Sequence, residues 1–328
     1  MRFSIICSVY NAESFISKCI ESVLNNSFTD WELILLDDAS TDKTFLICEE
    51  YSKNDNRIKV VKSDRNIGPY NERIKGYLLA KGEYILNIDS DDSFCDIAFE
   101  IIDKKISQYN PDLIIYNENR IEQTGTFVLD KTQYEEYLLT DPNIIYKTYF
   151  QSYLLCQGLH RKCFKRKIIE TIDTTAKDSK MFEDGLFSLK VLDECKTVMF
   201  INDCLYNYRD INEQSLTKKY FASPKFDFGI ILEKMNIISH SNKLNKSTKS
   251  FALAKITNIV LDRIVYIINS ESINSGALSQ LKLLRKDVVV SQIISFKFSK
   301  KELHKRKVIL FLFKAHLFRV LILLVRKK

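Results

Sequence analysis

Three carboxylate side chains stand within four residues in the segment Asp89-Ser90-Asp91-Asp92. Acids this close repel one another unless a cation or water relieves the repulsion. Mg²⁺ and Mn²⁺ prefer oxygen ligands, and often use only one or two carboxylates together with the phosphates of a substrate. Asp89, Asp91 and Asp92 are therefore candidate ligands for Mn²⁺ or Mg²⁺. The alternative is an exposed turn or a helix cap, which Asp and Ser also favour.

A second acidic pair, Asp37-Asp38, precedes Ser40-Thr41-Asp42. A carboxylate here could accept a hydrogen bond from the N3–H of a uracil ring. The same short polar residues could equally cap the helix expected next, with Ser40 or Thr41 as the cap. Both interpretations stay open, but a second acidic cluster after a second strand-like run favours ligand binding over a simple turn at residues 89–92.

Two further polar features could take part in the same chemistry. Arg73 follows the Gly68-Pro69 turn; its guanidinium could lie beside a diphosphate, or it could be a solvated helix residue. Glu183-Asp184 is flanked by apolar residues, where charge is costly to bury unless it is used or paired. A capping or salt-bridging pair would explain it, but a general base that takes a proton from a hydroxyl group is favoured here.

Short apolar segments alternate with amphipathic ones from residue 3 to residue 116. This spacing implies right-handed crossovers and a mainly parallel sheet with helices on both faces. Ligands of such sheets bind at the carboxyl ends of the strands, where both acidic clusters and Ser8-Val9-Tyr10-Asn11 stand. The predicted strands are 3–9, 31–36, 57–61, 84–88 and 112–116; the predicted helices are 12–26, 42–52, 70–80 and 97–108.

The alternation loosens beyond residue 120. Residues 121–150 read as irregular, 151–170 as a basic helix-like segment and 182–192 as an acidic one. From about 225 to 295 the pattern is helical and amphipathic. A boundary is therefore expected near residue 220.

Several of these segments, taken together and in this order, resemble glycosyltransferase family 2. They are Ser4-Ile5-Ile6-Cys7-Ser8-Val9-Tyr10-Asn11, the run from Asp37 to Asp42, Gly82-Glu83-Tyr84-Ile85 leading to Asp89–Asp92, and Glu183-Asp184. Two later segments, Lys162-Cys163-Phe164-Lys165-Arg166 and the run from Tyr206 to Ser215, are similar to motifs of capsule and lipooligosaccharide transferases of that family.

The resemblance implies a GT-A fold, a Rossmann-like α/β architecture with a mainly parallel sheet, followed here by a C-terminal helical region. Together with the helical pattern after residue 220 and the basic end of the chain, the expected domains are a catalytic domain over 1–220, a helical region over 221–299 and a basic apolar helix over 300–328. Within the catalytic domain, 1–116 would bind the nucleotide and 117–220 the acceptor.

The resemblance also implies roles for individual residues. Asp184 would be the catalytic base, and Asp89, Asp91 and Asp92 would form the D-x-D element at the ribose and the metal. Two departures stand out: Ser8 replaces a common proline, and His160 replaces a common tryptophan of the acceptor region, which leaves the acceptor open. The residues implied to bind substrate are Ser8, Tyr10, Asp38, Arg73, Asp89, Glu183, Lys162 and Arg209.

The expected reaction is inverting transfer of a sugar from a nucleotide-diphosphate donor, UDP-hexose or UDP-N-acetylhexosamine, to a glycan or lipid-linked glycan in surface polysaccharide or lipooligosaccharide synthesis. A sugar-phosphate nucleotidyltransferase would share the fold, but should carry a glycine-rich basic loop after the first strand, which Ser8-Val9-Tyr10-Asn11 lacks. A non-catalytic, membrane-associated protein that binds nucleotide sugars is the other alternative.

The net charge of +7 is concentrated at one end of the chain. Residues 300–328 hold ten Lys or Arg and one acid, whereas the remaining residues hold 39 basic and 41 acidic groups. A body this close to neutral argues against nucleic-acid binding. Residues 308–325 are apolar but interrupted by Lys314, His316 and Arg319, which disfavours a membrane span. We expect 300–328 to lie in the plane of an anionic membrane.

The cysteines show no C-x-x-C pair, and no signal peptide precedes the first strand-like run. Reduced thiols in a cytoplasmic enzyme, peripheral on the cytoplasmic face of the membrane, are therefore expected.

Overall fold

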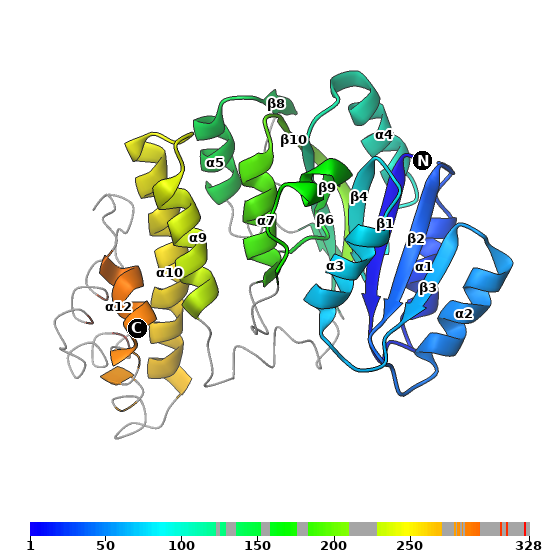
Figure 1. Ribbon diagram of the computed structural model, residues 1–328, viewed down its shortest axis with the longest axis horizontal. Helices are drawn as coiled ribbons and strands as arrows, with labels where there is room; N and C mark the ends of the chain where they lie inside the picture. The colour runs from blue at the N-terminus through cyan, green and yellow to red at the C-terminus, as the bar shows by residue number, and fades with distance from the viewer. Residues whose placement is uncertain are drawn as a thin grey trace. The chain divides into compact units, whose positions relative to one another are not determined.

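The computed structural model describes residues 1–122, 125–128, 136–151, 158–175, 183–209, 228–270 and 286–295, with isolated positions at 279, 281–282, 284, 309, 313 and 325. The chain divides into two compact units (Figure 1). The first contains Met1–Asp141 and Ser152–Pro224, and the second contains Pro142–Gln151 and Lys225–Lys328.

The first unit is built on a mixed sheet whose strand order is β3-β2-β1-β4-β9-β6-β10-β5. Its first four strands are parallel, with β1 paired to both β2 and β4. They form because short, apolar, β-branched runs can be buried on both faces of a sheet. Their bounds are Phe3–Val9 for β1, Trp31–Asp37 for β2, Ile58–Lys62 for β3 and Tyr84–Asp89 for β4.

Helices cover both faces of this parallel part. The odd-numbered residues of β1, such as Ile5 and Cys7, share a core cluster with buried residues of α1 (Ile16–Leu24), α2 (Thr44–Asn54) and α4 (Ala98–Tyr109). The opposite face receives α3 (Pro69–Leu79). A Cβ atom at Gly76 would stand 2.6 Å from Ile6 Cγ2, so this glycine allows α3 to lie close against the sheet.

The remaining strands add antiparallel pairings. β9 (Lys162–Lys165) lies between β4 and β6 (Leu113–Glu122) and is antiparallel to both. β10 (Val198–Arg209) runs parallel to β6. Three short strands, β5 (Ser93–Phe94), β7 (Gly125–Val128) and β8 (Tyr137–Leu139), pair antiparallel with β10 or β6. The expected α/β sheet flanked by helices is confirmed: it is mostly parallel, with a few antiparallel strands.

Two sequence predictions beyond residue 120 are wrong. Residues 162–165 form β9 and 166–170 a 3-10 helix (η1, Arg166–Glu170), not part of a basic helix. Residues 121–150 are not irregular throughout, because β7, β8 and α5 (Pro142–Gln151) lie there. Lys162, Cys163 and Phe164 are almost completely buried, and burial between two strands outweighs the basic character of the segment. The acidic segment is the helix α7 (Glu183–Glu194), as predicted.

The second unit is helical in its described part. α5 contacts α10 (Lys246–Ser270), which also packs on α9 (Phe228–His240) and α12 (Val288–Ser295). Among the helices described, none combines the length and the apolar character that a membrane crossing requires. The predicted membrane-surface helix at 300–328 lies outside the described residues except for positions 309, 313 and 325.

Candidate active site

Arg73 joins two of the predicted site residues. Its Nη2 donates to Asp89 Oδ1 at 2.6 Å and its Nη1 donates to Asp184 Oδ1 at 2.8 Å. The guanidinium is buried, whereas both carboxylates remain about one-third exposed. The guanidinium of Arg73 therefore links the carboxyl end of β4 to the first turn of α7.

Packing explains how Arg73 reaches both acids. It lies one turn before Gly76, whose lack of a side chain lets α3 approach β1 and β2. Phe187 of α7 stacks on Tyr77 of α3, with ring centroids 5.1 Å apart. This aromatic contact holds the first turn of α7 beside α3. Two residues far apart in the sequence, Arg73 and Asp184, thereby become neighbours.

The electrostatics of Arg73 follow from this placement. Burial by itself lowers the pKa of a guanidinium, because it disfavours the charged form. The negative charges of Asp184 and Asp89 outweigh that effect, and the pKa of Arg73 is raised above its usual value. Arg73 is thus a fixed cation facing two carboxylates, and the group of three carries one excess negative charge.

The acidic segment Asp89–Asp92 forms a tight turn, in which the amide of Asp92 donates to the carbonyl oxygen of Asp89 at 3.0 Å. Asp89 and Asp91 are half-buried, whereas Asp92 is buried. Burial, followed by repulsion from Asp89 and Asp91, raises the pKa of Asp92 well above its usual value. The three acids are therefore close enough to affect one another, as the sequence suggested.

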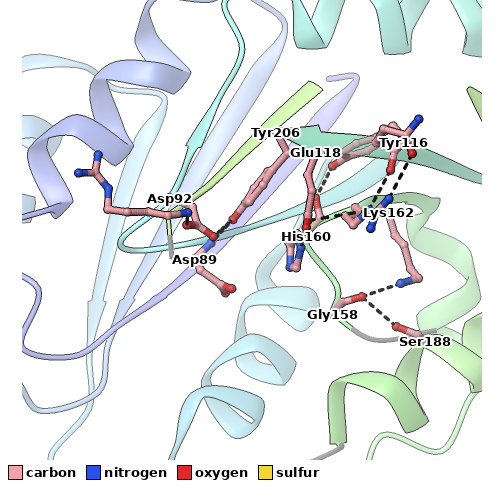
Figure 2. A network of polar contacts seen from close by, with 12 residues as sticks. Asp89, Asp92, Tyr116, Glu118, Gly158, His160, Lys162, Ser188 and Tyr206 are labelled. Atoms are coloured by element: carbon pink, nitrogen blue, oxygen red, sulfur yellow. Dashed lines mark hydrogen bonds and ion pairs between the residues drawn. The ribbon is translucent and has the colours of Figure 1, made fainter. Parts of the chain in front are cut away.

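Asp92 is turned toward β10 (Figure 2). Its Oδ2 accepts a hydrogen bond from the Tyr206 hydroxyl at 2.7 Å, and its Oδ1 accepts one from the Arg209 amide at 2.7 Å. The Arg209 side chain donates through Nε to the Asp91 carbonyl oxygen at 3.1 Å. Arg209 thus lies at the acidic turn, and Asp92 supports the turn from inside.

A divalent cation fits this donor set. Within the described ranges, no three His, Cys, Asp or Glu side chains converge as a complete metal site. Hard cations that bind nucleotides often take only one or two carboxylates, with phosphates as the other ligands. Asp89 and Asp91 are both partly exposed on a turn whose charges repel and match that requirement, whereas Asp92 is buried.

The residues expected at the nucleoside lie at the ends of β1 and β2. Ser8 is partly exposed and pairs in register with Asp89, so it borders the acidic turn. Tyr10 is 49% exposed. Next to it, Asn11 accepts the Thr41 amide through its side chain at 2.9 Å, which ties the loops after β1 and β2 together.

Asp38 follows the end of β2 and lies against the loop that leads into α3. It is 1% exposed, and its two oxygens accept the amides of Ile67 and Gly68 at 2.6 and 2.9 Å. Gly68 has a φ of +87°, a conformation that glycine adopts without strain. Asp38 therefore shapes the loop that leads into α3, and its contact with a nucleoside stays a prediction.

Neither Ser40 nor Thr41 caps α2, because the residue before its first turn is Lys43, whose side chain forms no capping hydrogen bond. The carboxylate of Asp42 accepts the Thr44 amide at 3.0 Å, whereas Ser40 and Thr41 form hydrogen bonds with Asn11. Ser40 and Thr41 thus connect the loops that follow β1 and β2.

Lys162 and Glu183 complete the predicted set. Lys162 is fully buried, and its ammonium donates to the Gly158 carbonyl oxygen at 2.6 Å. Glu183 is half-buried at the start of α7, next to Asp184. The structure therefore brings Arg73, Asp89 and Asp184 together and places Ser8 and Arg209 at the same turn. Lys162 is directed at Gly158.

Sequence reasoning missed Glu118 of β6, which is the partner of His160. Glu118 is buried and its carboxylate lies 2.7 Å from His160 Nε2. The His160 ring packs against Tyr206, with centroids 4.8 Å apart. A signal was present, because Asn117-Glu118-Asn119-Arg120 puts polar residues at the end of an apolar strand.

The sequence profile of the family described as Glycosyl transferase family 2 matches residues 4–172, just over half of the chain. The glycosyltransferase GlyA of Streptococcus pneumoniae is 28% identical over 223 residues, which cover 66% of this chain and 32% of that protein. The poly(ribitol-phosphate) beta-N-acetylglucosaminyltransferase TarS of Staphylococcus aureus is 25% identical over 262 residues, which cover 79% of this chain and 44% of that protein. The chain thus spans less than half the length of either relative.

A solved structure of residues 1–349 of S. aureus TarS in complex with UDP-GlcNAc superimposes with a TM-score of 0.78. The match covers 98% of this chain and 90% of that one at 20% sequence identity. At this identity the likeness concerns the fold alone, and it confirms the α/β architecture expected from the sequence.

Proposed function

Because the chain belongs to glycosyl transferase family 2, we propose that it transfers a sugar from a nucleotide-diphosphate donor to a hydroxyl group of a glycan in surface polysaccharide or lipooligosaccharide synthesis. One observation carries the proposal, namely the pairing of Arg73 with both Asp89 and Asp184. A donor diphosphate next to Asp89 and an acceptor hydroxyl next to Asp184 would occupy adjoining positions. UDP-hexose and UDP-N-acetylhexosamine are the proposed donors, and the UDP-GlcNAc bound by TarS supports this choice.

Asp89 and Asp91 are the proposed ligands of Mn²⁺ or Mg²⁺. When bound, such a cation neutralises negative charge on a departing diphosphate. Asp92, held by Tyr206 and Arg209, keeps the turn in shape. Arg73 holds Asp89 in position from the other side through its 2.6 Å contact.

Asp184 is the proposed general base. It is about one-third exposed, so an acceptor hydroxyl can approach it, and it would take the hydroxyl proton as the oxygen attacks the anomeric carbon. Its contact with Arg73 restricts the orientation of the carboxylate before substrate binds. Direct displacement inverts the anomeric centre, so an α-linked donor gives a β-linked product.

A panel of UDP- and GDP-sugars, assayed for nucleoside-diphosphate release with Mn²⁺ and again with EDTA, tests the proposal. We expect release of UDP that depends on the metal and increases with a glycan acceptor. Activity retained in EDTA would contradict the metal assignment. Pyrophosphate released from UTP and a sugar phosphate would indicate a nucleotidyltransferase. UDP binding without turnover of any donor would indicate a non-catalytic binding protein.

The segment 300–328 is proposed to hold the protein on the cytoplasmic face of a membrane. Its ten basic residues, set against one acid, would each attract an anionic surface by about 1 kcal/mol. Flotation with vesicles that contain anionic lipid, comparing the full chain with one that ends at residue 299, tests this. An unchanged membrane-bound fraction in the shortened chain would remove the anchoring role.

A further inference from the structure

Tyr206 connects the two ends of the acidic turn. Its hydroxyl oxygen accepts the amide of Asp89 at 3.0 Å, and its hydroxyl proton is donated to Asp92 Oδ2 at 2.7 Å. The side chain is fully buried in β10. One oxygen atom therefore fixes both the last residue of β4 and the last acid of the turn (Figure 2).

The ring that carries this hydroxyl is held on two sides. Phe94 meets it edge-on, with centroids 5.4 Å apart and an interplanar angle of 89°. His160 covers it at 4.8 Å and 31°. Since buried aromatic rings packed in this way have little freedom to move, the position of the Tyr206 hydroxyl depends on both neighbours.

His160 is itself fixed by hydrogen bonds. Its Nε2 lies 2.7 Å from Glu118 Oε2, and its carbonyl oxygen accepts the Tyr116 hydroxyl at 2.7 Å. Burial would raise the pKa of Glu118, but hydrogen bonding to His160 and the nearby positive charges lower it. The buried carboxylate of Glu118 thus orients the imidazole, whose face packs against the Tyr206 ring.

We propose that Tyr206 is a positioning residue for the donor side of the reaction, and that the His160–Glu118 pair acts through it. In this arrangement the tyrosine hydroxyl sets the shape of the turn that presents Asp89 and Asp91 to the cation and the diphosphate. Glu118 of β6 and His160, which precedes β9, hold the tyrosine ring in the position from which its hydroxyl reaches that turn. The identity of the ligand in this inference rests on the proposed function. The contacts that join His160, Tyr206 and the acidic turn do not depend on it.

The contacts explain why the hydroxyl is needed. Asp92 is 3% exposed and close to two other acids, so each donor that reaches it offsets repulsion as well as loss of water. Without the hydroxyl, Asp92 keeps the Arg209 amide but loses its contact on Oδ2. The Asp89 amide loses its acceptor at the same time. Each end of the turn then has one hydrogen bond fewer, and we expect both ends to move more easily.

The test is Tyr206→Phe, which removes one oxygen and keeps the ring. Amide hydrogen exchange in a peptide that spans residues 86–94 should become faster. Calorimetric titration with UDP and Mn²⁺ should show the half-saturating Mn²⁺ concentration raised about tenfold, as expected for the loss of one hydrogen bond to a charged group. The KM for the acceptor should be unchanged.

Tyr84→Phe is the matched control. Tyr84 is also fully buried, and its hydroxyl donates to the Pro111 carbonyl oxygen at 2.7 Å. It lies at the start of β4, the opposite end of the strand from Asp89. Both variants lose one buried hydroxyl, so a general loss of stability would affect them alike. Only Tyr206→Phe should alter the Mn²⁺ dependence.

His160→Gln tests the second part of the proposal, because the amide can still donate to Glu118 but offers no ring face. It should raise the half-saturating Mn²⁺ concentration in the same direction, by a smaller factor. In a Tyr206→Phe background it should have no further effect. An additive effect would show that His160 acts independently of Tyr206 and would overturn that part.

The outcomes separate this inference from the proposed function. If the wild type releases no nucleoside diphosphate from any donor, the function fails, while the hydrogen-exchange comparison still decides the role of Tyr206. If the wild type is active, and Tyr206→Phe matches Tyr84→Phe in both exchange and Mn²⁺ dependence, the positioning role is wrong.

Discussion

Buried acidic residues at the two ends of the parallel strands differ in how well hydrogen-bond donors offset their charge. At the starting end, Glu32 is fully buried and accepts the Ser4 hydroxyl and the Lys81 amide, each at 2.7 Å. At the finishing end, Asp92 is buried beside two other acids, and Asp37 Oδ1 finds no hydrogen-bond partner among the described residues.

The pKa values express the same difference. Burial would raise the pKa of Glu32, but hydrogen bonds from Lys59, Ser4 and the Lys81 amide lower it overall. The pKa of Asp92 is raised by burial and by repulsion. The starting end is electrostatically satisfied and contributes stability, whereas the finishing end retains negative charge that a ligand can relieve. Strongly perturbed acids of the second kind are frequent at functional sites.

The largest effect is expected for Asp91→Ala, which removes a proposed metal ligand at the finishing end. Metal-dependent donor binding should fall to background in a calorimetric titration with UDP and Mn²⁺. Because the substitution also removes one of the charges that repel Asp92, the free energy of unfolding should not decrease. Asp96→Ala, an exposed acid just beyond the turn, is the control and should bind normally. Normal binding by Asp91→Ala would contradict the proposal that acids at the finishing end of the strands bind the metal.

Asp184→Asn should lower kcat by about 10²–10⁴-fold, the usual contribution of a general base. Donor binding should persist, because the amide oxygen can still accept from Arg73 Nη1. Steady-state kinetics and UDP titration measure the two quantities separately. Glu194→Gln, exposed at the far end of α7, should leave both unchanged. Near-normal turnover in Asp184→Asn would remove this residue from the role of base.

Glu32→Gln should act on stability and not on catalysis. The Glu32 carboxylate accepts hydrogen bonds from three donors, so loss of its charge should lower the free energy of unfolding, measured in urea, by about 2–3 kcal/mol. The kcat of the folded protein should stay the same, because Glu32 lies at the starting end of β2. Glu49→Gln breaks only an exposed ion pair with Lys53 and should change stability by less than about 0.5 kcal/mol. A loss of activity without a loss of stability in Glu32→Gln would contradict the assignment of the two ends.

The smallest effect is a change in the pH dependence of unfolding. Glu32 and Asp112 both have lowered pKa values in the folded state, so the unfolded chain binds more protons than the folded one in acid. The stability they contribute is present above their unfolded pKa values and is lost as the pH falls through the folded ones. Urea unfolding between neutral and acidic pH should show this decline. The decline should be shallower in Glu32→Gln, and an unchanged profile would show that Glu32 does not take part.

Much of the first unit could be predicted because local patterns and global packing agree there. The four parallel strands were placed within one residue at each end, since apolar runs such as residues 3–9 have no alternative to burial. Prediction failed at β9, where a basic segment pairs between β4 and β6. The pairing depends on residues 47 to 81 positions away in the sequence, and no local signal carries that information.

In the candidate site, too, the sequence predicts some features and only the packing of distant elements decides others. The sequence alone determined which residues are candidates for the chemistry, because three acids within four residues and an acidic pair among apolar neighbours are costly unless they are used or paired. Only the tertiary structure decided that Asp38 supports a loop, that Asp92 is directed at Tyr206 and that Arg73 lies between Asp89 and Asp184. The reason is physical: spacing along the chain fixes which face of a helix or strand a side chain occupies, whereas its partners are set by packing between elements that are distant in sequence.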